Sequence, residues 1–136
     1  MQHHPPDHTQ VASLVDEMCD YVNQKWNSLL PADLAAYVMW RINWIHPFFG
    51  GNGRTARSAS YLVLCAKLGF LPAGKETIPE LIAANREPYY EALRSADAAW
   101  AQGILDVSAM RKVICDALAE QLVRVFGQAT GITPKA

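Results

Sequence analysis

The segment IHPFFGGNGRTAR, residues 45–57, combines residue types that are typical of a phosphate-binding site. The glycines within residues 51–53 let the backbone adopt positive φ angles, so that several N–H groups can point at one anion. A helix that begins directly after such a turn adds its unpaired first-turn N–H groups and the positive end of its dipole. This pattern therefore predicts an anion site, and a phosphate group is its usual occupant.

Side chains on both sides of these glycines indicate what chemistry the anion undergoes. Arg54 and Arg57 lie one helical turn apart and can face the same anion, and two guanidinium groups suit a polyphosphate. On the other side, the imidazole of His46 can act as a general base toward a hydroxyl nucleophile. We expect Phe48 to turn inward as a hydrophobic anchor. The segment thus predicts phosphoryl or nucleotidyl transfer.

The rest of the chain predicts an all-α bundle that positions this loop. Apolar residues at helical spacing indicate helices over residues 11–26, 31–45, 54–68, 78–85, 87–103 and 106–126, and no segment alternates as a strand does. Asp7 or Thr9 could cap the first helix, and Pro31 suits the first turn of the second. The His46-Pro47 pair should end that second helix. The third helix follows the loop and is apolar nearly all round in its second half, so we predict that it is central and buried.

Length and composition narrow the domain organisation and the function classes. We predict one domain over residues 1–136, with an extended lead-in over residues 1–8 and a frayed tail over residues 128–136. The net charge is −1 and no basic block is present, which argues against binding to nucleic acid. No apolar run is long enough to span a membrane.

The cysteines indicate a cellular compartment. Cys19, Cys65 and Cys115 are far apart and lie among apolar neighbours, without a CxxC spacing. We therefore expect them to be buried free thiols of a protein in a reducing compartment, and we expect a cytoplasmic location.

The loop residues resemble the signature of the Fic family, which reads His-Pro-Phe-x-Asp/Glu-Gly-Asn-Gly-Arg-x-x-Arg. This chain has HPFFGGNGRTAR, and the segments WRINWIHPF and NREPYYEAL fit the family as well. The resemblance covers nearly the whole chain and implies a Fic-type helical bundle. It also implies an adenylyltransferase, which transfers AMP from ATP to a Ser, Thr or Tyr hydroxyl of a target protein.

Carried over by position, the resemblance gives catalytic roles to three residues. His46 would deprotonate the target hydroxyl, as its chemistry alone also suggests. Asn52 would contact the α-phosphate region of the nucleotide. Arg54 would hold the β-phosphate.

Four further positions complete the implied nucleotide site. Gly51 and Gly53 would form, with the residue between them, an anion hole around the phosphates. Arg57 would engage the γ-phosphate. Tyr90, in NREPYYEAL, matches a position where the family can place an aromatic ring against the adenine.

One position departs from the signature, because Gly50 stands where the family has an acidic residue. In the family this residue coordinates the Mg²⁺ that bridges the leaving phosphates, so the expected Mg²⁺ has no protein ligand here. Loss of such a contact costs roughly a hundredfold in rate or more. Four explanations of Gly50 stay open. The protein is a naturally weakened adenylyltransferase, or an adenylyltransferase whose sequence has been altered at this position. Otherwise it transfers a different phosphate-linked group, or it is a non-catalytic domain that binds a nucleotide or a partner.

The implied partners are ATP as substrate and a target protein with a hydroxyl side chain. Relatives usually dock the target on a β-hairpin flap upstream of the PPD lead-in, whereas only a handful of residues precede that lead-in here. Either the sequence is a trimmed domain or the target docks in another way. Ser13 and Glu17 have the spacing of the family's inhibitory motif, but Met18 follows them, so we interpret them as a solvated helix face. An inhibitor could be a separate protein. Neither nucleic acid nor a membrane is an expected partner, and the oligomeric state is left open.

Overall fold

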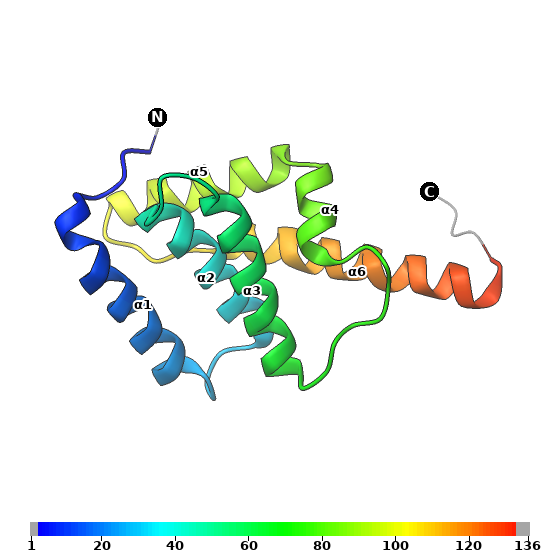
Figure 1. Cartoon of the computed structure of the whole chain (residues 1–136). Helices are drawn as coiled ribbons and strands as arrows, with labels where there is room; N and C mark the ends of the chain where they lie inside the picture. The colour runs from blue at the N-terminus through cyan, green and yellow to red at the C-terminus, as the bar shows by residue number, and fades with distance from the viewer. Residues whose placement is uncertain (1–2, 133–136) are drawn as a thin grey trace.

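The computed structural model describes residues 3–132 of the chain and contains no strand within them. A 3-10 turn, η1, spans His8–Gln10, and the helices are α1 (Val11–Lys25), α2 (Pro31–Ile45), α3 (Asn52–Leu68), α4 (Ile78–Ala84), α5 (Glu87–Ala101) and α6 (Ser108–Thr130). In Figure 1, α2 and α3 lie side by side, α1 flanks them on one side, and α5 crosses the top. The prediction of an all-α fold is confirmed.

The buried centre of the bundle is α2. This helix begins with Pro31 in its first turn, is buried without interruption from Leu34 to Ile42, and packs against α1, α3, α5 and α6. The prediction that α3 is the central buried helix is wrong. Its apolar second half is covered on one face only, so that Leu62 is 69% exposed.

Small residues bring α3 close to α2. Ala56 and Ser60 lie on the buried face of α3, and the Ser60 hydroxyl donates a hydrogen bond to the carbonyl of Ala35 at 2.8 Å. This bond satisfies a polar group that burial would otherwise penalise. Because α3 is fixed to α2 in this way, the loop between the two helices is held at both of its ends.

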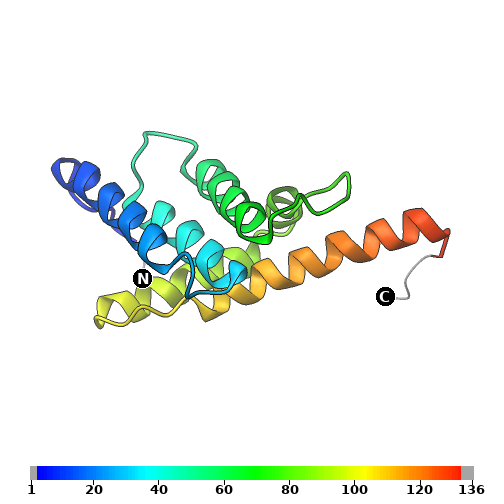
Figure 2. The same ribbon diagram turned by 90° about the horizontal axis from the view of Figure 1, so that it is seen from below.

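The chain departs from the sequence prediction at both of its ends. Residues 3–7 form no helix or strand, but His8 of the predicted extended lead-in belongs to η1, which Asp7 caps by accepting a hydrogen bond from the Thr9 N–H at 2.9 Å. At the other end, α6 continues to Thr130 and its C-terminal half extends past the other helices (Figures 1 and 2). The predicted frayed tail is therefore wrong for residues 128–130, which are helical, and residues 133–136 lie outside the described residues.

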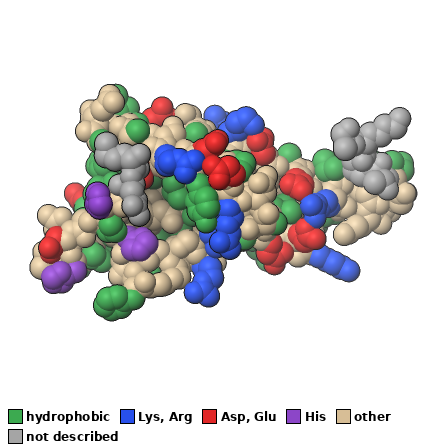
Figure 3. Space-filling model, turned by 90° about the horizontal axis from the view of Figure 1, so that it is seen from above, with side chains coloured by type: hydrophobic (Ala, Val, Ile, Leu, Met, Phe, Trp, Pro, Cys, Tyr) green, Lys and Arg blue, Asp and Glu red, His purple; other side chains and the backbone are tan. Residues whose placement is uncertain are grey.

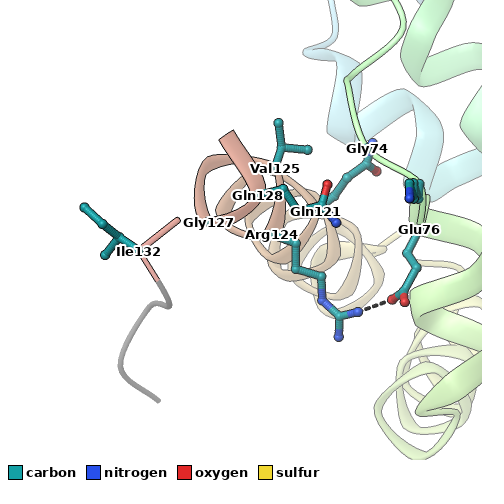
Figure 4. Close-up of a pocket in the computed structure, with 9 residues that line it drawn as sticks. Gly74, Glu76, Gln121, Arg124, Val125, Gly127, Gln128 and Ile132 are labelled. Carbon is teal, nitrogen blue, oxygen red and sulfur yellow. Dashed lines mark hydrogen bonds and ion pairs between the residues drawn. The ribbon is translucent and has the colours of Figure 1, made fainter. Parts of the chain in front are cut away.

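The segment between α3 and α4 is attached to α6 by polar contacts (Figure 4). The buried Gln121 amide donates hydrogen bonds to the carbonyls of Pro72 and Ala73 at 3.1 and 3.0 Å, and Arg124 forms an ion pair with Glu76. A pocket of about 440 Å³ lies beside these contacts. None of its lining residues belongs to the loop after α2, so it is separate from the predicted phosphate site.

A buried arginine lies among the tryptophans of the bundle. Arg41 is 5% exposed, and its guanidinium carbon lies 5.4, 4.6 and 4.9 Å from the ring centroids of Trp40, Trp44 and Trp100. Its Nη2 lies 3.9 Å from the carboxylate of Glu17, whereas its Nε and Nη1 have no hydrogen-bond partner among the described residues. Glu17 is thus turned toward Arg41 from the exposed side of α1, which agrees with a solvated helix face.

The cysteines differ from their predicted environment. All three are free, but Cys19 and Cys115 are exposed and only Cys65 is buried. Apolar neighbours in the sequence place a residue near a buried helix face without placing it on that face. As for membranes, no helix of residues 3–132 combines the length and the apolar character needed to cross one.

Candidate nucleotide site

The loop begins where α2 ends, at a residue with an unusual backbone conformation. His46 has φ 53° and ψ 58°, and it is the non-glycine residue with positive φ within residues 3–132. Its N–H still bonds the carbonyl of Ile42, and Pro47 then prevents further helix. This confirms the predicted end of the helix. The left-handed turn costs about 1 kcal/mol and leaves the His46 side chain exposed at the mouth of the loop.

Asn52 holds the loop in its turn. The N–H of Phe48 donates to Asn52 Oδ1 at 2.9 Å, and Asn52 Nδ2 donates to the carbonyl of Phe48 at 2.7 Å. Asn52 is 4% exposed, so these bonds form beneath the loop surface. The side chain therefore shapes the glycine-rich loop, a role that sequence reasoning missed. Its predicted contact with an α-phosphate stays a prediction.

The two phenylalanines of the loop point outward. Phe48 is 53% exposed and Phe49 is fully exposed, so the prediction of Phe48 as an inward anchor is wrong. The Asn52 bonds fix the backbone of Phe48 in a turn, and its ring then lies at the edge of an apolar groove. This groove, about 540 Å³ in volume, is lined by side chains of α1 and α2 such as Val15 and Ile45.

Both motif arginines fold back over the glycines. Gly51 has φ 78°, and a Cβ atom there would lie 3.3 Å from Nη2 of Arg54. A Cβ atom on Gly53 would lie 3.0 Å from Nη1 of Arg57. The missing side chains thus make room for the guanidinium groups. In contrast, a Cβ atom on Gly50 would have no atom within 4 Å.

Arg57 rests on a buried support. Its guanidinium carbon lies 5.7 Å from the ring centroid of Tyr89, which is 1% exposed. The Tyr89 hydroxyl accepts a hydrogen bond from Asn43 Nδ2 at 2.6 Å, and Asn43 also bonds the carbonyl of Met39. Burial raises the pKa of Tyr89, so the hydroxyl keeps its proton at neutral pH. Residues of α2, α3 and α5 together hold this arginine in place.

These residues surround a cleft of about 360 Å³ at the loop and the start of α5. Its lining consists of polar, aromatic and glycine residues together with one leucine: Asn43, Gly51, Gly53, Arg54, Arg57, Arg86, Tyr89, Tyr90 and Leu93. Most of the predicted nucleotide residues are thus brought together. His46 and Asn52 belong to the same loop but do not line the cleft. In Figure 3, Lys and Arg side chains gather across the middle of this face, and histidines lie toward α1.

Sequence reasoning missed four residues of the cleft, which are Asn43, Arg86, Tyr89 and Leu93. A signal was available for Arg86, because it precedes Tyr90 by four residues and so lies on the same side of α5. Tyr89 and Asn43 gave no local signal, since their contact joins α5 to α2.

Comparison with known proteins agrees with this geometry. The model of the Fic/DOC family matches residues 1–64, which include α1, α2, the loop and most of α3. This part of the chain belongs to the Fic/DOC family. The chain is also 33% identical over 96 residues to the proteins called "Protein adenylyltransferase Fic" of Drosophila willistoni, Drosophila persimilis and Drosophila grimshawi. The matched stretch covers 70% of this chain and 18% of each relative.

The Mg²⁺ expected for a Fic domain does not fit the residues of this cleft. Its lining contains no carboxylate, and Gly50 stands at the acidic position of the signature. No group of three or more His, Cys, Asp or Glu side chains within residues 3–132 could hold a metal ion. Mg²⁺ is usually held by one or two carboxylates together with phosphates and water. The residues of this cleft therefore offer the ion no carboxylate ligand.

Proposed function

We propose that this Fic domain binds ATP in the cleft and transfers AMP to a hydroxyl group of a target protein. The observation that carries the proposal is that one loop joins an exposed imidazole at its start to a basic cleft at its end. His46 opens this loop, and Arg54 and Arg57 line the cleft behind it. The names of the relatives support the same reaction type, although this chain spans only a small part of their length.

The proposed binding mode follows from the charges of the cleft. The triphosphate lies against Arg54 and Arg57 and the first-turn N–H groups of α3. The adenine lies against Tyr90, whose ring is 40% exposed at the rim. Asn43 and Tyr89 act as positioning residues, because they support Arg57 from below.

In the proposed reaction, the target hydroxyl oxygen forms a bond to the α-phosphorus. The bond from that phosphorus to the oxygen bridging to the β-phosphate breaks at the same centre. His46 accepts the hydroxyl proton, and pyrophosphate leaves with its growing negative charge against the two motif arginines. Without an acidic residue at Gly50, we expect transfer to be slower than in a complete Fic signature by roughly a hundredfold.

The second candidate is a Fic domain that binds a nucleotide or a partner without catalysis. The absence of a carboxylate from the cleft lining favours it. The exposed imidazole of His46 argues against it, because binding alone needs no general base. A transferase of another phosphate-linked group is a third candidate.

The test follows label transfer from ATP to protein. The chain is incubated with a cell extract and ATP labelled in the α-phosphate, and in parallel with ATP labelled in the γ-phosphate. We expect α-label on protein, more of it with Gly50→Asp, and none with His46→Ala. His8→Ala is the matched control, since His8 is exposed on η1 and does not line the cleft.

Each other outcome has a defined meaning. Transfer of γ-label instead would favour the third candidate. If neither label reaches protein, even with Gly50→Asp, but ATP still binds, the result favours the non-catalytic candidate.

A further inference from the structure

The charges around the cleft differ from those of the rest of the molecule. Each arginine outside the cleft forms an ion pair with a carboxylate, and these pairs are Arg41 with Glu17, Arg94 with Glu87, Arg111 with Asp33, and Arg124 with Glu76 and Glu120. The arginines that line the cleft are Arg54, Arg57 and Arg86, and none of them pairs with a carboxylate of residues 3–132. The arginines without a carboxylate partner are thus concentrated in one place.

Arg86 has a fixed position at the cleft. It stands directly before α5, and its Nε donates a hydrogen bond to the carbonyl of Ala83 at 3.1 Å. This bond orients the guanidinium group and leaves its two Nη atoms for a ligand. The neighbouring carboxylate of Glu87 is engaged at 3.2 Å by Arg94. Arg86 therefore keeps its full charge for the cleft.

A free triphosphate matches this arrangement in charge. Three guanidinium groups and the first turn of α3 can neutralise most of the negative charge of metal-free ATP. A divalent cation on the phosphates would remove two of those negative charges and would lie among three positive side chains, with no carboxylate to hold it. Electrostatics thus favour the metal-free nucleotide over its magnesium complex.

We propose that this cleft binds the nucleotide polyphosphate without a divalent cation, with Arg86 as a third phosphate-binding arginine beside Arg54 and Arg57. The proposal rests on the nucleotide site of the proposed function and names the form of the substrate that this site takes. It also gives Gly50 a physical meaning, because an acidic residue there would cancel part of the charge that binds metal-free ATP.

The test measures ATP affinity by titration calorimetry on the whole chain, once in EDTA and once in excess Mg²⁺. We expect metal-free ATP to bind at least as tightly as the magnesium complex. Arg86→Gln should weaken the binding of metal-free ATP about tenfold, as expected for a lost charged hydrogen bond, and leave adenosine binding unchanged. Arg94→Gln, which removes an arginine of α5 outside the cleft, is the matched control and should change neither affinity. Gly50→Asp should reverse the preference toward the magnesium complex.

The results that overturn the proposal differ from those that overturn the proposed function. The proposal is wrong if the unchanged chain binds ATP only with Mg²⁺, or if Arg86→Gln behaves as Arg94→Gln does. Because Arg86 is exposed, its loss should leave the thermal unfolding midpoint unchanged, and this is checked first. If the chain binds metal-free ATP but transfers no label, the proposed transferase function is wrong and the proposal of metal-free binding still holds. If the chain transfers label but binds ATP only in the presence of Mg²⁺, the transferase function holds and the proposal of metal-free binding is wrong.

Discussion

The side chain of Asn52 forms two hydrogen bonds with the backbone of Phe48, accepting from its N–H at 2.9 Å and donating to its carbonyl at 2.7 Å. The turn from Phe48 to Asn52 is thereby closed by an amide that lies under the loop, and the glycines of the loop can present their N–H groups outward. Asparagine suits this role because it offers a donor and an acceptor at neighbouring atoms. An aspartate of the same shape could not donate to the carbonyl.

We predict that Asn52→Ala destabilises the fold and weakens nucleotide binding together. Two partly buried backbone groups of Phe48 lose their partners, which should lower the free energy of unfolding by about 2 kcal/mol. Urea unfolding measures this change, and calorimetry with ATP measures the affinity. Asn23→Ala on the exposed face of α1 is the control and should stay within about 0.5 kcal/mol. Lost affinity at unchanged stability would mean instead that the amide contacts the nucleotide directly.

Adjacent glycines of the loop should respond differently to the same substitution. Gly51→Ala places a Cβ atom at φ 78° and close to Arg54, and it should cost about 1–2 kcal/mol. Gly50→Ala meets open space, and it should be neutral or slightly stabilising because it restricts the unfolded chain. Urea midpoints of the two variants, measured side by side, decide the point. Equal losses would show that the conformation of the loop differs from the one described.

The buried Arg41 should depend on its tryptophans more than on its carboxylate. Arg41→Lys replaces a planar group that stacks on three rings by a compact ammonium group, and it should cost about 1–2 kcal/mol. Glu17→Gln removes an exposed partner 3.9 Å away and should cost less than about 0.5 kcal/mol. Thermal unfolding of both variants separates these contributions. A larger loss from Glu17→Gln would assign the stabilisation to the ion pair.

Local signals in the sequence were enough for the helices and for the loop. The bounds of α2 follow from Pro31 at its start and the His46-Pro47 pair at its end, both of which act through the backbone of neighbouring residues. The turn before α3 follows from the glycines that stand directly before that helix. These features need no knowledge of the rest of the molecule, and the structure contains them where the sequence predicts them.

The errors concern contacts between elements. Periodicity indicates which face of a helix is apolar but not how many neighbours surround it, so α3 was mistaken for the central helix in place of α2. The outward direction of Phe48 depends on two bonds made by Asn52, and the position of Arg57 depends on Tyr89 and Asn43 from other helices. Such pairings are set by tertiary packing, which a single sequence does not encode in its local pattern.

Alkaline pH should destabilise the protein through its tyrosines. Burial raises the pKa of Tyr21, Tyr37, Tyr61 and Tyr89 above the ordinary value of 10.0. The unfolded chain then loses its phenolic protons at lower pH than the folded chain does. The contribution of these tyrosines to the free energy of unfolding is therefore fully present below about pH 10 and is lost as the pH rises through their pKa values in the folded chain. Urea unfolding between about pH 9 and pH 11.5 measures the slope, and Tyr89→Phe should make it shallower. An unchanged slope in this variant would exclude Tyr89 as a contributor.

The open space around Gly50 separates two properties that are usually linked in an enzyme. Most residues at a reaction site also support the fold, so that a change of chemistry carries a cost in packing. A side chain at position 50 would meet no other atom of the described protein within 4 Å of its Cβ. Selection on the charge of the cleft can therefore act at this position without opposition from stability, and a lineage can lose or regain an acidic residue there through single substitutions that the helical core does not resist.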